Sequence, residues 1–435
     1  MKTRLILSLT ISLLVYPKSG FSQTKDSLTL NSIISEVVQN HPLVKKASEE
    51  LTSADAKIGI AKSGYLPNAE FGASYTRIGP VSEITLPGAT KSFSLMPTDN
   101  YSAAFSISQS IYDFGRTSKS ISLEKQAKEL TRQSVEQVKQ RLSQTAIANY
   151  FTLVYLQEAL KIKEEQLNTL NEHLRFVQKK QATGSATQYE ILTTQVRISA
   201  IENQKIDLEA ARQVQVSQLN SLLGKPENSP ELVKNEIAVS LTDLQSDALI
   251  ASAMHNRDEM KLAREKAKLA ELRYSLTNTQ NSASLNGFAS AGIKNGYIPY
   301  MYDPTPNFTA GVSFKIPIHD GKRTKYNLVQ AKSAIQVNNQ ETEFTRRGIV
   351  NEVVEMQSGV KSAQKKVEQS ELQLKQATQA YALAKVRFES GVITNLELLE
   401  GSTSVSESRL MLLKSKIDYS ISLYKLRSAI GERLY

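Results

Sequence analysis

Two similar short stretches, Ile111-Tyr112-Asp113-Phe114-Gly115-Arg116 and Ile318-His319-Asp320-Gly321-Lys322-Arg323, indicate how this chain is organised. The second stretch follows the first by 207 residues, since 320 − 113 = 207. A later pair of glycines, Gly184 and Gly391, keeps the same offset of 207. An ungapped internal repeat of this kind predicts two copies of one structural unit. We therefore expect two units of equal and fixed length.

The segment after each stretch predicts a very long helix. Apolar residues in the first unit recur at steps of three, four or seven, the spacing of a helix that packs as a coiled coil: Leu153, Leu156, Leu160, Leu167, Leu170, Leu174 and Val177. Neither proline nor glycine occurs between Gly115 and Gly184, so nothing there breaks the helix. At 1.5 Å per residue such a helix is roughly 100 Å long.

These patterns predict a helical hairpin in each unit. In the first unit we expect a long helix over 115–183 and a return helix over 188–223. In the second unit we expect an unbroken long helix over 322–390 and a return helix over 395–430. The whole first unit then covers 23–224, and the second covers 246–435. A linker over 225–245, which repeats nothing, is expected to pack on the outside of the helices near their middle.

The N-terminus has the pattern of a secretory signal peptide. Lys2 and Arg4 precede an apolar run from Leu5 to Tyr16, and small residues follow before Gln23. A run of about a dozen apolar residues is too short to cross a bilayer as a helix. We therefore exclude residues 1–22 from the fold and expect the protein to be exported.

Composition narrows the function further. The net charge of +10 is compatible with anionic partners such as nucleic acid or lipid headgroups. However, the basic residues are dispersed along helical faces, and an exported protein seldom meets nucleic acid, so we expect no nucleic-acid partner. The chain has no cysteine, and its four histidines are scattered. With no metal-ligand spacing, phosphate-binding loop or nucleophile elbow, the sequence predicts no metal, no cofactor and no enzyme.

Each unit also contains a segment with a period of two, which predicts strands. Tyr101, Phe105 and Ile107 alternate with small polar residues in the first unit, as Phe308 and Val312 do in the second. We expect one β-hairpin over 68–111 and another over 283–317. A soluble antiparallel sheet can have one apolar face. In an exported chain such strands also fit a sheet with its apolar face toward lipid and its polar face toward a lumen.

The loops between the strands carry a second membrane signal. Residues 79–100 contain three prolines and are expected to form a long exposed loop. In the other hairpin, Tyr297, Tyr300 and Tyr302 lie where an aromatic girdle at a membrane interface would be. Local packing within the loop explains the three tyrosines equally well, so both interpretations stay open.

Four strands per chain imply an oligomer if the sheet lies in lipid. An open sheet edge is not tolerated in hydrocarbon, because its unpaired N–H and C=O groups have no water to bond. Two chains would form an eight-stranded barrel whose interior is filled by side chains. The small serines on the polar face indicate a wet lumen instead, which calls for three chains and twelve strands.

These features together resemble the TolC-like outer-membrane efflux protein family, whose members are outer membrane factors or channel-tunnels. The resemblance lies in the signal peptide, the tandem units, the Asp113-Phe114-Gly115 and Asp320-Gly321-Lys322 turns, and the tips at Gly184 and Gly391. It implies a mainly α fold with a small transmembrane β-barrel portion. In that family a homotrimer forms a 12-stranded barrel in the outer membrane and an α-helical tunnel through the periplasm.

The resemblance also implies partners and a function. The tunnel would act passively with a periplasmic adaptor (membrane fusion) protein and an inner-membrane pump, in a tripartite efflux or type I secretion system. A hypothesis from a different class is a soluble periplasmic coiled-coil adaptor or tether, whose strands form a small sandwich. A channel should fractionate with the outer membrane, whereas a soluble adaptor should appear in the periplasmic wash.

The second tip holds the candidate gate. Glu397 and Glu400 lie three residues apart on the return helix, hence on one face, and threefold symmetry would make them two carboxylate rings that favour cations. By resemblance these positions match the acidic constriction at the periplasmic end of the family's tunnel. Phe388 stands where the family often has Tyr, and Ile393 where it has Arg. In the first unit Glu190 matches Glu397. The other interpretation is that these acids simply suit the positive end of the helix dipole.

The turns themselves are the expected adaptor contacts, because they form the far end of the tube. They comprise Gly184, Ser185, Ala186 and Thr187 at the first tip, and Gly391, Val392, Ile393 and Thr394 at the second.

Overall fold

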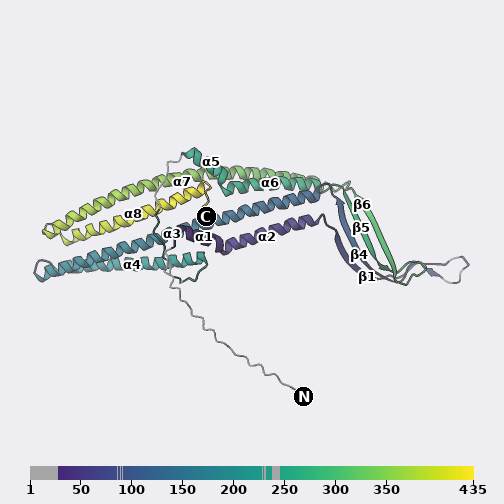
Figure 1. Cartoon of the computed structure of the whole chain (residues 1–435), viewed down its shortest axis with the longest axis horizontal. Helices are drawn as coiled ribbons and strands as arrows, with labels where there is room; N and C mark the ends of the chain where they lie inside the picture. Colours follow the sequence, from purple (N-terminus) through teal and green to yellow (C-terminus); the bar gives the residue numbers. More distant parts are fainter. Residues whose placement is uncertain are drawn as a thin grey trace, which may run out of the picture.

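The computed structural model describes residues 28–435 except 86, 89, 91, 228, 230–231 and 238–244. The expected signal peptide, 1–22, lies outside the described residues. In the described part, long helices form one elongated body, and a four-stranded sheet continues it at one end (Figure 1).

The two units have the same order of main elements. The first unit contains α1 (Leu30–Asn40), α2 (Pro42–Ser63), β1 (Asn68–Arg77), β2 (Glu83–Ile84), β3 (Phe93–Ser94), β4 (Asp99–Tyr112), α3 (Arg116–Ala182) and α4 (Gln188–Leu223). The second contains α5 (Ser246–Asn256), α6 (Asp258–Thr279), β5 (Ser284–Lys294), β6 (Thr305–Lys315), α7 (Arg323–Glu389) and α8 (Asn395–Ala429).

The long helices are equal in length. Both α3 and α7 have 67 residues, which corresponds to roughly 100 Å each. They begin at Arg116 and Arg323, and 323 − 116 is again 207. Helix α7 runs without interruption through Gly348 and Gly359, although an interior glycine costs about 1 kcal/mol relative to alanine. Packing against α6 and α8 along its length outweighs this cost.

An aspartate at each strand-to-helix turn starts the long helix. The Asp113 carboxylate accepts hydrogen bonds from the backbone N–H of Gly115 at 3.1 Å and of Thr117 at 2.7 Å. In the second unit the Asp320 carboxylate accepts from the backbone N–H of Thr324 at 2.8 Å. The first N–H groups of a helix have no partner within the helix, so these carboxylates satisfy donors that the turn would leave free.

The helices form a curved layer in which the two long helices run the full length. Near the sheet the neighbours are α2, α3, α6 and α7 in that order, and toward the far end they are α4, α3, α8 and α7. The short helices therefore exchange places beside α3 and α7 near the middle of the layer. A cluster of fully buried side chains lies at this exchange, and it includes Ile33, Tyr150, Phe151 and Leu219.

The linker packs beside this cluster where the structure describes it. Val233 is buried and forms a parallel bridge with Leu28, and the Tyr150 hydroxyl donates a hydrogen bond to the Lys234 carbonyl at 2.5 Å. Residues 238–244 of the expected linker lie outside the described residues.

The sheet is antiparallel throughout, with the strand order β1-β4-β5-β6. Cross-strand partners share a face, and Phe71 pairs with Phe105, which pairs with Ala291 and then Phe308 in one apolar row. These aromatic side chains are exposed in the single chain, Phe71 by 71% and Phe308 by 85%. The opposite face carries mostly small polar residues such as Ser106. Among the residues that the structure describes, no strand pairs with the outer edge of β1 or of β6.

The segment between β1 and β4 has more structure than the expected irregular loop. Glu83 pairs with Ser94, and Ile84 pairs with Phe93, to form the two-stranded sheet β2-β3. A ladder of two residues is too short to leave a periodic pattern in the sequence, which is why it was not predicted. Among the helices of the described chain, none combines the length and apolar character needed to cross a membrane.

Candidate functional site

The two helical hairpins end in the same turn. Gly184 and Gly391 adopt left-handed conformations with φ of 74° and 73°. One residue later, the Ser185 N–H donates to the Lys180 carbonyl, and the Val392 N–H donates to the Arg387 carbonyl, both at 2.8 Å. This is a helix-ending motif that depends on a positive φ, which glycine adopts without strain.

The expected adaptor-contact residues divide into exposed and packed positions. Most of the turn residues are exposed: Gly184, Ser185, Thr187, Gly391, Val392 and Thr394. Ala186 and Ile393 are half-buried and pack against a small core that contains Val177 and Leu398. The tips therefore offer a mostly small and polar outer surface on a packed base.

Glu190 and Glu397 each close a capping box at the start of a return helix. The Glu190 carboxylate accepts from the Thr187 N–H at 2.6 Å, and the Glu397 carboxylate accepts from the Thr394 N–H at 2.7 Å. The backbone N–H and then the hydroxyl of Thr394 hold the pKa of the Glu397 carboxyl below its ordinary value. This geometry matches the helix-start interpretation of the two acids. Glu400 is exposed one turn further along α8.

Phe388 lies between the two hairpins rather than on a free surface. Its side chain is only 6% exposed, and its ring centroid lies 5.4 Å from that of His173 and 6.2 Å from that of Phe176. The Lys180 ammonium lies 5.0 Å from the centroid of the same ring, a cation–π contact. Phe388 thus joins α7 to α3, and its expected place at an aperture stays a prediction.

Asn395, which sequence reasoning did not single out, is the main polar link between the tips. It is 4% exposed, and its Nδ2 donates to the Glu190 carbonyl at 3.3 Å and to the Thr194 hydroxyl at 3.2 Å. Its Oδ1 lies 2.6 Å from Nε2 of His173. Because the amide nitrogen is the donor, Oδ1 is the acceptor, and this arrangement assigns the proton to Nε2 of His173.

A second polar layer connects the hairpins further from the tips. The Gln166 Oε1 accepts from the Ser406 hydroxyl at 2.7 Å and from the buried Lys163 ammonium at 3.3 Å. Burial lowers the pKa of Lys163. We call the contact of α3 with α7 and α8 near the tips the inter-hairpin seam, comprising Lys163, Gln166, His173, Phe388, Asn395 and Ser406. Separating the hairpins would break the bonds between His173 and Asn395 and between Gln166 and Ser406, and leaving buried polar groups without partners is costly.

The sequence signal for the seam is a break in the repeat. Subtracting 207 from 395 and 388 gives Gln188 and Gln181, and adding 207 to 173 gives Ala380. The two units are therefore unlike at the positions where they contact each other. The repeat is therefore broken at the residues that join the two hairpins.

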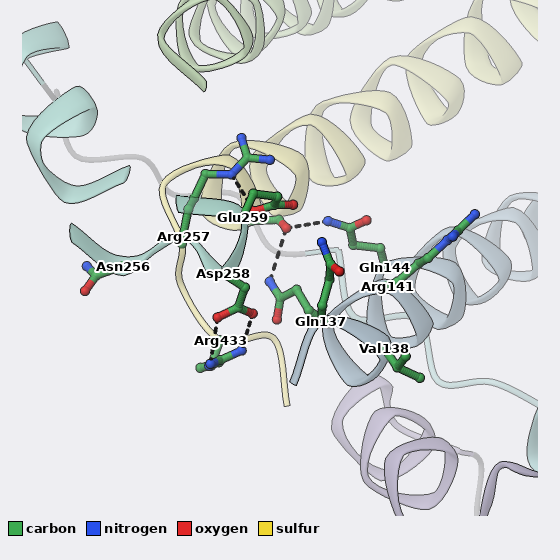
Figure 2. Close-up of a pocket in the computed structure, with 12 residues that line it drawn as sticks. Gln137, Val138, Arg141, Gln144, Asn256, Arg257, Asp258, Glu259 and Arg433 are labelled. Atoms are coloured by element: carbon green, nitrogen blue, oxygen red, sulfur yellow. Dashed lines mark hydrogen bonds and ion pairs between the residues drawn. The ribbon is translucent and has the colours of Figure 1, made fainter. Parts of the chain in front are cut away.

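A pocket of about 340 Å³ lies where the short helices exchange places (Figure 2). Several of the charged residues that line it form ion pairs. Arg257 bonds Glu259 at 3.0 Å and Glu352 at 2.5 Å, and Arg433 bonds Asp258 at 2.6 and 3.0 Å. These ion pairs connect the start of α6 with α7 and with the C-terminal segment.

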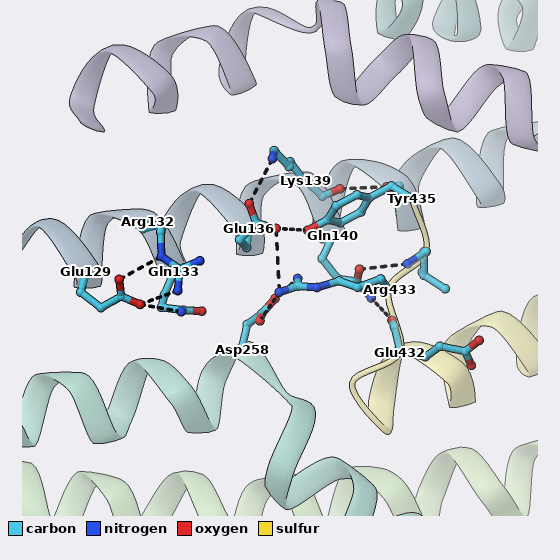
Figure 3. Close-up of polar contacts among 12 residues, drawn as sticks. Glu129, Arg132, Gln133, Glu136, Lys139, Gln140, Asp258, Glu432, Arg433 and Tyr435 are labelled. Atoms are coloured by element: carbon cyan, nitrogen blue, oxygen red, sulfur yellow. Dashed lines mark hydrogen bonds and ion pairs between the residues drawn. The ribbon is translucent and has the colours of Figure 1, made fainter. Parts of the chain in front are cut away.

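The C-terminal segment itself is fastened to α3 (Figure 3). Gln140 donates to the Glu432 carbonyl at 2.9 Å and accepts from the Leu434 N–H at 3.3 Å. The Tyr435 hydroxyl donates to the Glu136 carboxylate at 2.5 Å, and Glu136 also pairs with Lys139 at 3.0 Å. This network holds the last turn of α8 against α3. Across the described residues, no group of three or more His, Asp or Glu side chains is placed to hold a metal ion.

Both structural units match one known protein family. The family model described as "Outer membrane efflux protein" matches residues 33–225 and 249–432, one segment for each structural unit. The chain belongs to the outer membrane efflux protein family. This confirms the resemblance drawn from the repeat, and it places the protein in the outer membrane with an extension into the periplasm.

Relatives of this efflux protein are distant in sequence but similar over their whole length. Outer membrane protein TolC of Escherichia coli K12 is 20% identical over 433 residues, covering 95% of this chain and 84% of TolC. Nodulation protein T of Rhizobium leguminosarum bv. trifolii is 20% identical over 416 residues, covering 92% of this chain and 85% of its own.

Solved structures confirm the predicted fold class. The outer membrane protein VceC of Vibrio cholerae superposes with a TM-score of 0.76 at 18% identity, covering 93% of this chain and 97% of VceC. CusC, whose structures concern transmembrane channel formation, gives a TM-score of 0.77 at 17% identity and covers 99% of both chains. The efflux protein therefore has the combined helical tunnel and β-barrel type of fold seen in these channels.

The buried position of His173 predicts that the inter-hairpin seam is weaker in acid. Burial lowers the pKa of His173, the bond to Asn395 and the charge of Glu190 oppose this shift, and Lys180 reinforces it. The pKa of His173 in the folded protein is below 6.5. The contribution of the neutral ring to the free energy of unfolding is therefore fully present above pH 6.5 and decreases as the pH falls below 6.5. The decrease in Tm from pH 7.5 to pH 5.0 should therefore be larger in the native protein than in His173→Gln. Equal decreases would contradict the prediction, since all other titrating groups are common to both.

Replacing Asn395 with alanine should weaken the seam strongly. The variant would leave the His173 N–H without its acceptor and would remove one of the hydrogen bonds of the Thr194 hydroxyl and the Glu190 carbonyl, at a cost of roughly 1–3 kcal/mol. Thermal unfolding measures the loss, and hydrogen exchange locates it at the tips. The matched control is Gln188→Ala, which changes the equivalent exposed position of the other unit and should leave Tm nearly unchanged. Similar effects of the two substitutions would contradict the assigned role of Asn395.

Proposed function

We propose that the protein is the outer-membrane channel-tunnel of a tripartite efflux or type I secretion system. In this proposal a homotrimer conducts substrates passively from a periplasmic pump and adaptor to the outside, and the protein catalyses no reaction. The observation that carries the proposal is a four-stranded sheet whose two edges are unpaired and whose apolar face is uncovered.

The unpaired strands argue for closure by copies of the same chain. Edge strands β1 and β6 lie at opposite ends of one antiparallel sheet, so β6 of one copy is in position to pair with β1 of the next. In hydrocarbon every backbone N–H and C=O group needs a partner, and a closed barrel supplies them all. Three copies make twelve strands, with the row of Phe71, Phe105 and Phe308 toward lipid and the serines toward a wet lumen.

The two outer sides of the helical layer both expose apolar side chains that no other described helix of this chain covers. Its outer helices are α7 on one side and α4 on the other toward the tips. Helix α7 is an outer helix along its whole length and exposes a stripe of large apolar side chains, of which Phe344 toward the sheet is 73% and Val386 toward the tips is 61% exposed. Helix α4 exposes a similar stripe that includes Val196 at 70% and Ile206 at 61%. Their spacing places each stripe on one side of its helix, and apolar stripes of this length are usually covered by a partner.

The names of the relatives support a conduit shared by several export systems. One relative is the proteases secretion protein PrtF of Dickeya chrysanthemi, and another is the probable efflux pump outer membrane protein TtgC of Pseudomonas putida. Their 20% and 23% identity to this chain extends over 91% and 96% of it. The proposal is therefore the common role of an outer-membrane exit duct, with the adaptor docked on the exposed turn residues around Gly184 and Gly391.

At the tips we propose a selective aperture formed by carboxylates. Glu397 and Glu400 lie beyond the packed base of the second tip and are exposed in the single chain. Three copies would bring them together as two rings, and Glu190 would add charge from the first tip. Phe388 contributes by holding the hairpins together. Because the Thr394 N–H stabilises the charged form of Glu397, that carboxylate would stay ionised in the ring.

A charge on the α7 stripe tests the trimer. Phe344→Glu should shift the detergent-purified protein from a trimer, about three times the chain mass, toward monomers, because a buried unpaired carboxylate opposes the subunit contact. Light scattering coupled to size-exclusion chromatography measures the mass. The control Phe344→Leu should stay trimeric. A native protein that is monomeric and found in the periplasmic wash would contradict the proposal and favour the soluble tether.

Neutralising the tip carboxylates tests the aperture. Glutamine also closes a capping box, so the double change Glu397→Gln and Glu400→Gln should preserve the helix start while removing the ring charge. Single-channel recordings in a salt gradient should then show a reversal potential closer to zero, meaning a lower preference for cations. The control Glu172→Gln removes an exposed charge on α3 outside the tip turns. Unchanged selectivity in the double variant would contradict the ring assignment.

A further inference from the structure

The polar face of the sheet carries a single aromatic side chain. All positions of this face are among the described residues, and they are small or polar apart from Phe288: Asn68, Glu70, Gly72, Ser74, Thr76, Asn100, Ser102, Ala104, Ser106, Ser108, Ser110, Ser284, Asn286, Phe288, Ser290, Gly292, Lys294, Thr305, Asn307, Thr309, Gly311, Ser313 and Lys315. The remaining aromatic residues of the four strands lie on the other face or near its ends. Phe288 therefore interrupts the alternation of β5.

The strand register fixes the direction of Phe288. It pairs with Ser108 on β4 and with Gly311 on β6, whereas the next residue, Ala289, pairs with Ile107 on the apolar face. Gly311 is what lets the ring lie against the neighbouring strand, because a Cβ at that position would lie only 2.8 Å from Cζ of Phe288. The ring nevertheless remains 43% exposed. The glycine and the phenylalanine thus form a fitted pair that leaves one side of the ring free.

A carboxylate lies on the same face. Glu70 on β1 is in the row of Ser106 and Ser290, so it is two strands across and one row along from Phe288. Two inter-strand spacings amount to about 10 Å. The lysines of this face lie further along the strands, with Lys294 six residues and Lys315 four residues from the Phe288–Gly311 row. An exposed aromatic ring attracts cations and flat apolar groups, and the nearby acid adds attraction for positive charge.

We infer that Phe288 and Glu70 form a contact site for planar aromatic cations on the inner wall of the barrel. The inference rests on the proposed trimeric channel, in which this face lines the lumen. Phe288 is the fifth of the 11 residues of β5, so it lies near the middle of the strand. Three copies would place three rings at one level of the barrel, near the middle of its wall. A solute that passes this level would bind transiently to one of the rings. Aromatic cations would stay bound longer than other solutes of equal charge.

The experiment is ethidium block of the purified full-length protein in planar bilayers. In the native protein, ethidium should cause brief current reductions. The dwell time should shorten roughly two- to fivefold in Phe288→Ser, which is the size expected for loss of one exposed cation–π contact. Phe288→Leu keeps the apolar bulk and should also shorten the dwell time, which separates loss of the aromatic ring from a change in folding. Spermidine, a cation that cannot stack on the ring, should show a smaller shortening of its dwell time in both variants than ethidium does.

Two further variants separate the site from general effects. Glu70→Gln should shorten the dwell times of both ethidium and spermidine. Phe308→Leu changes the exposed aromatic residue on the apolar face and should leave ethidium dwell times unchanged. A conducting trimer with the same ethidium dwell time in Phe288→Ser, Phe288→Leu and the native protein would overturn this inference but leave the proposed function intact. Absence of conductance from the native protein would overturn both.

Discussion

The unpaired hydrogen-bonding groups along β1 and β6 are the constraint on which the rest of the structure depends. A four-stranded antiparallel sheet with one apolar face has no stable place for its edges in a single chain, particularly next to lipid. Pairing between copies removes both edges at once. The helical layer follows the same geometry, since α7 and α4 expose apolar stripes on opposite outer sides. Sheet and helices thus require the same neighbours.

Equal length is the second requirement, and the repeat supplies it. Helices α3 and α7 both have 67 residues, and each starts from an aspartate-capped turn directly after a strand. The two hairpins therefore reach the same level at the far end, where their turns have the same backbone geometry. In a tube built from such units, all the hairpin turns would lie at the same level. An insertion in one unit alone would displace one tip relative to the other and disrupt the contacts between them.

At the tips, the two structural units of one chain differ in the side chains that join them. The backbone turns are equivalent, but Asn395, His173 and Phe388 have no counterparts of the same type in the other unit. Apolar packing at Phe388 supplies attraction without direction, whereas the hydrogen bonds of Asn395 specify which surfaces meet. A buried polar network stabilises a contact only when all of its hydrogen bonds are formed. The inter-hairpin seam is therefore well defined when the hairpins are in contact, and separating them partly costs free energy. At the opposite end of α8, the ion pair of Arg433 with Asp258 fastens the C-terminal segment to the start of α6.

The sequence by itself determined the long and return helices, the two β-hairpins and the face pattern of the sheet, but not the short β2-β3 ladder. Those features depend on local periodicity and on turn residues such as Gly184, Gly391, Asp113 and Asp320, which act within a few positions of themselves. It also located the tips and the acids near them. Only the tertiary structure decided what those side chains do: Glu190 and Glu397 bind their own helix starts, Phe388 is buried, and Asn395 with His173 joins the hairpins. Those roles depend on which helix lies beside which. Residues 173 and 395 are brought together by packing across more than two hundred positions, and no periodic pattern in a single sequence encodes that distance.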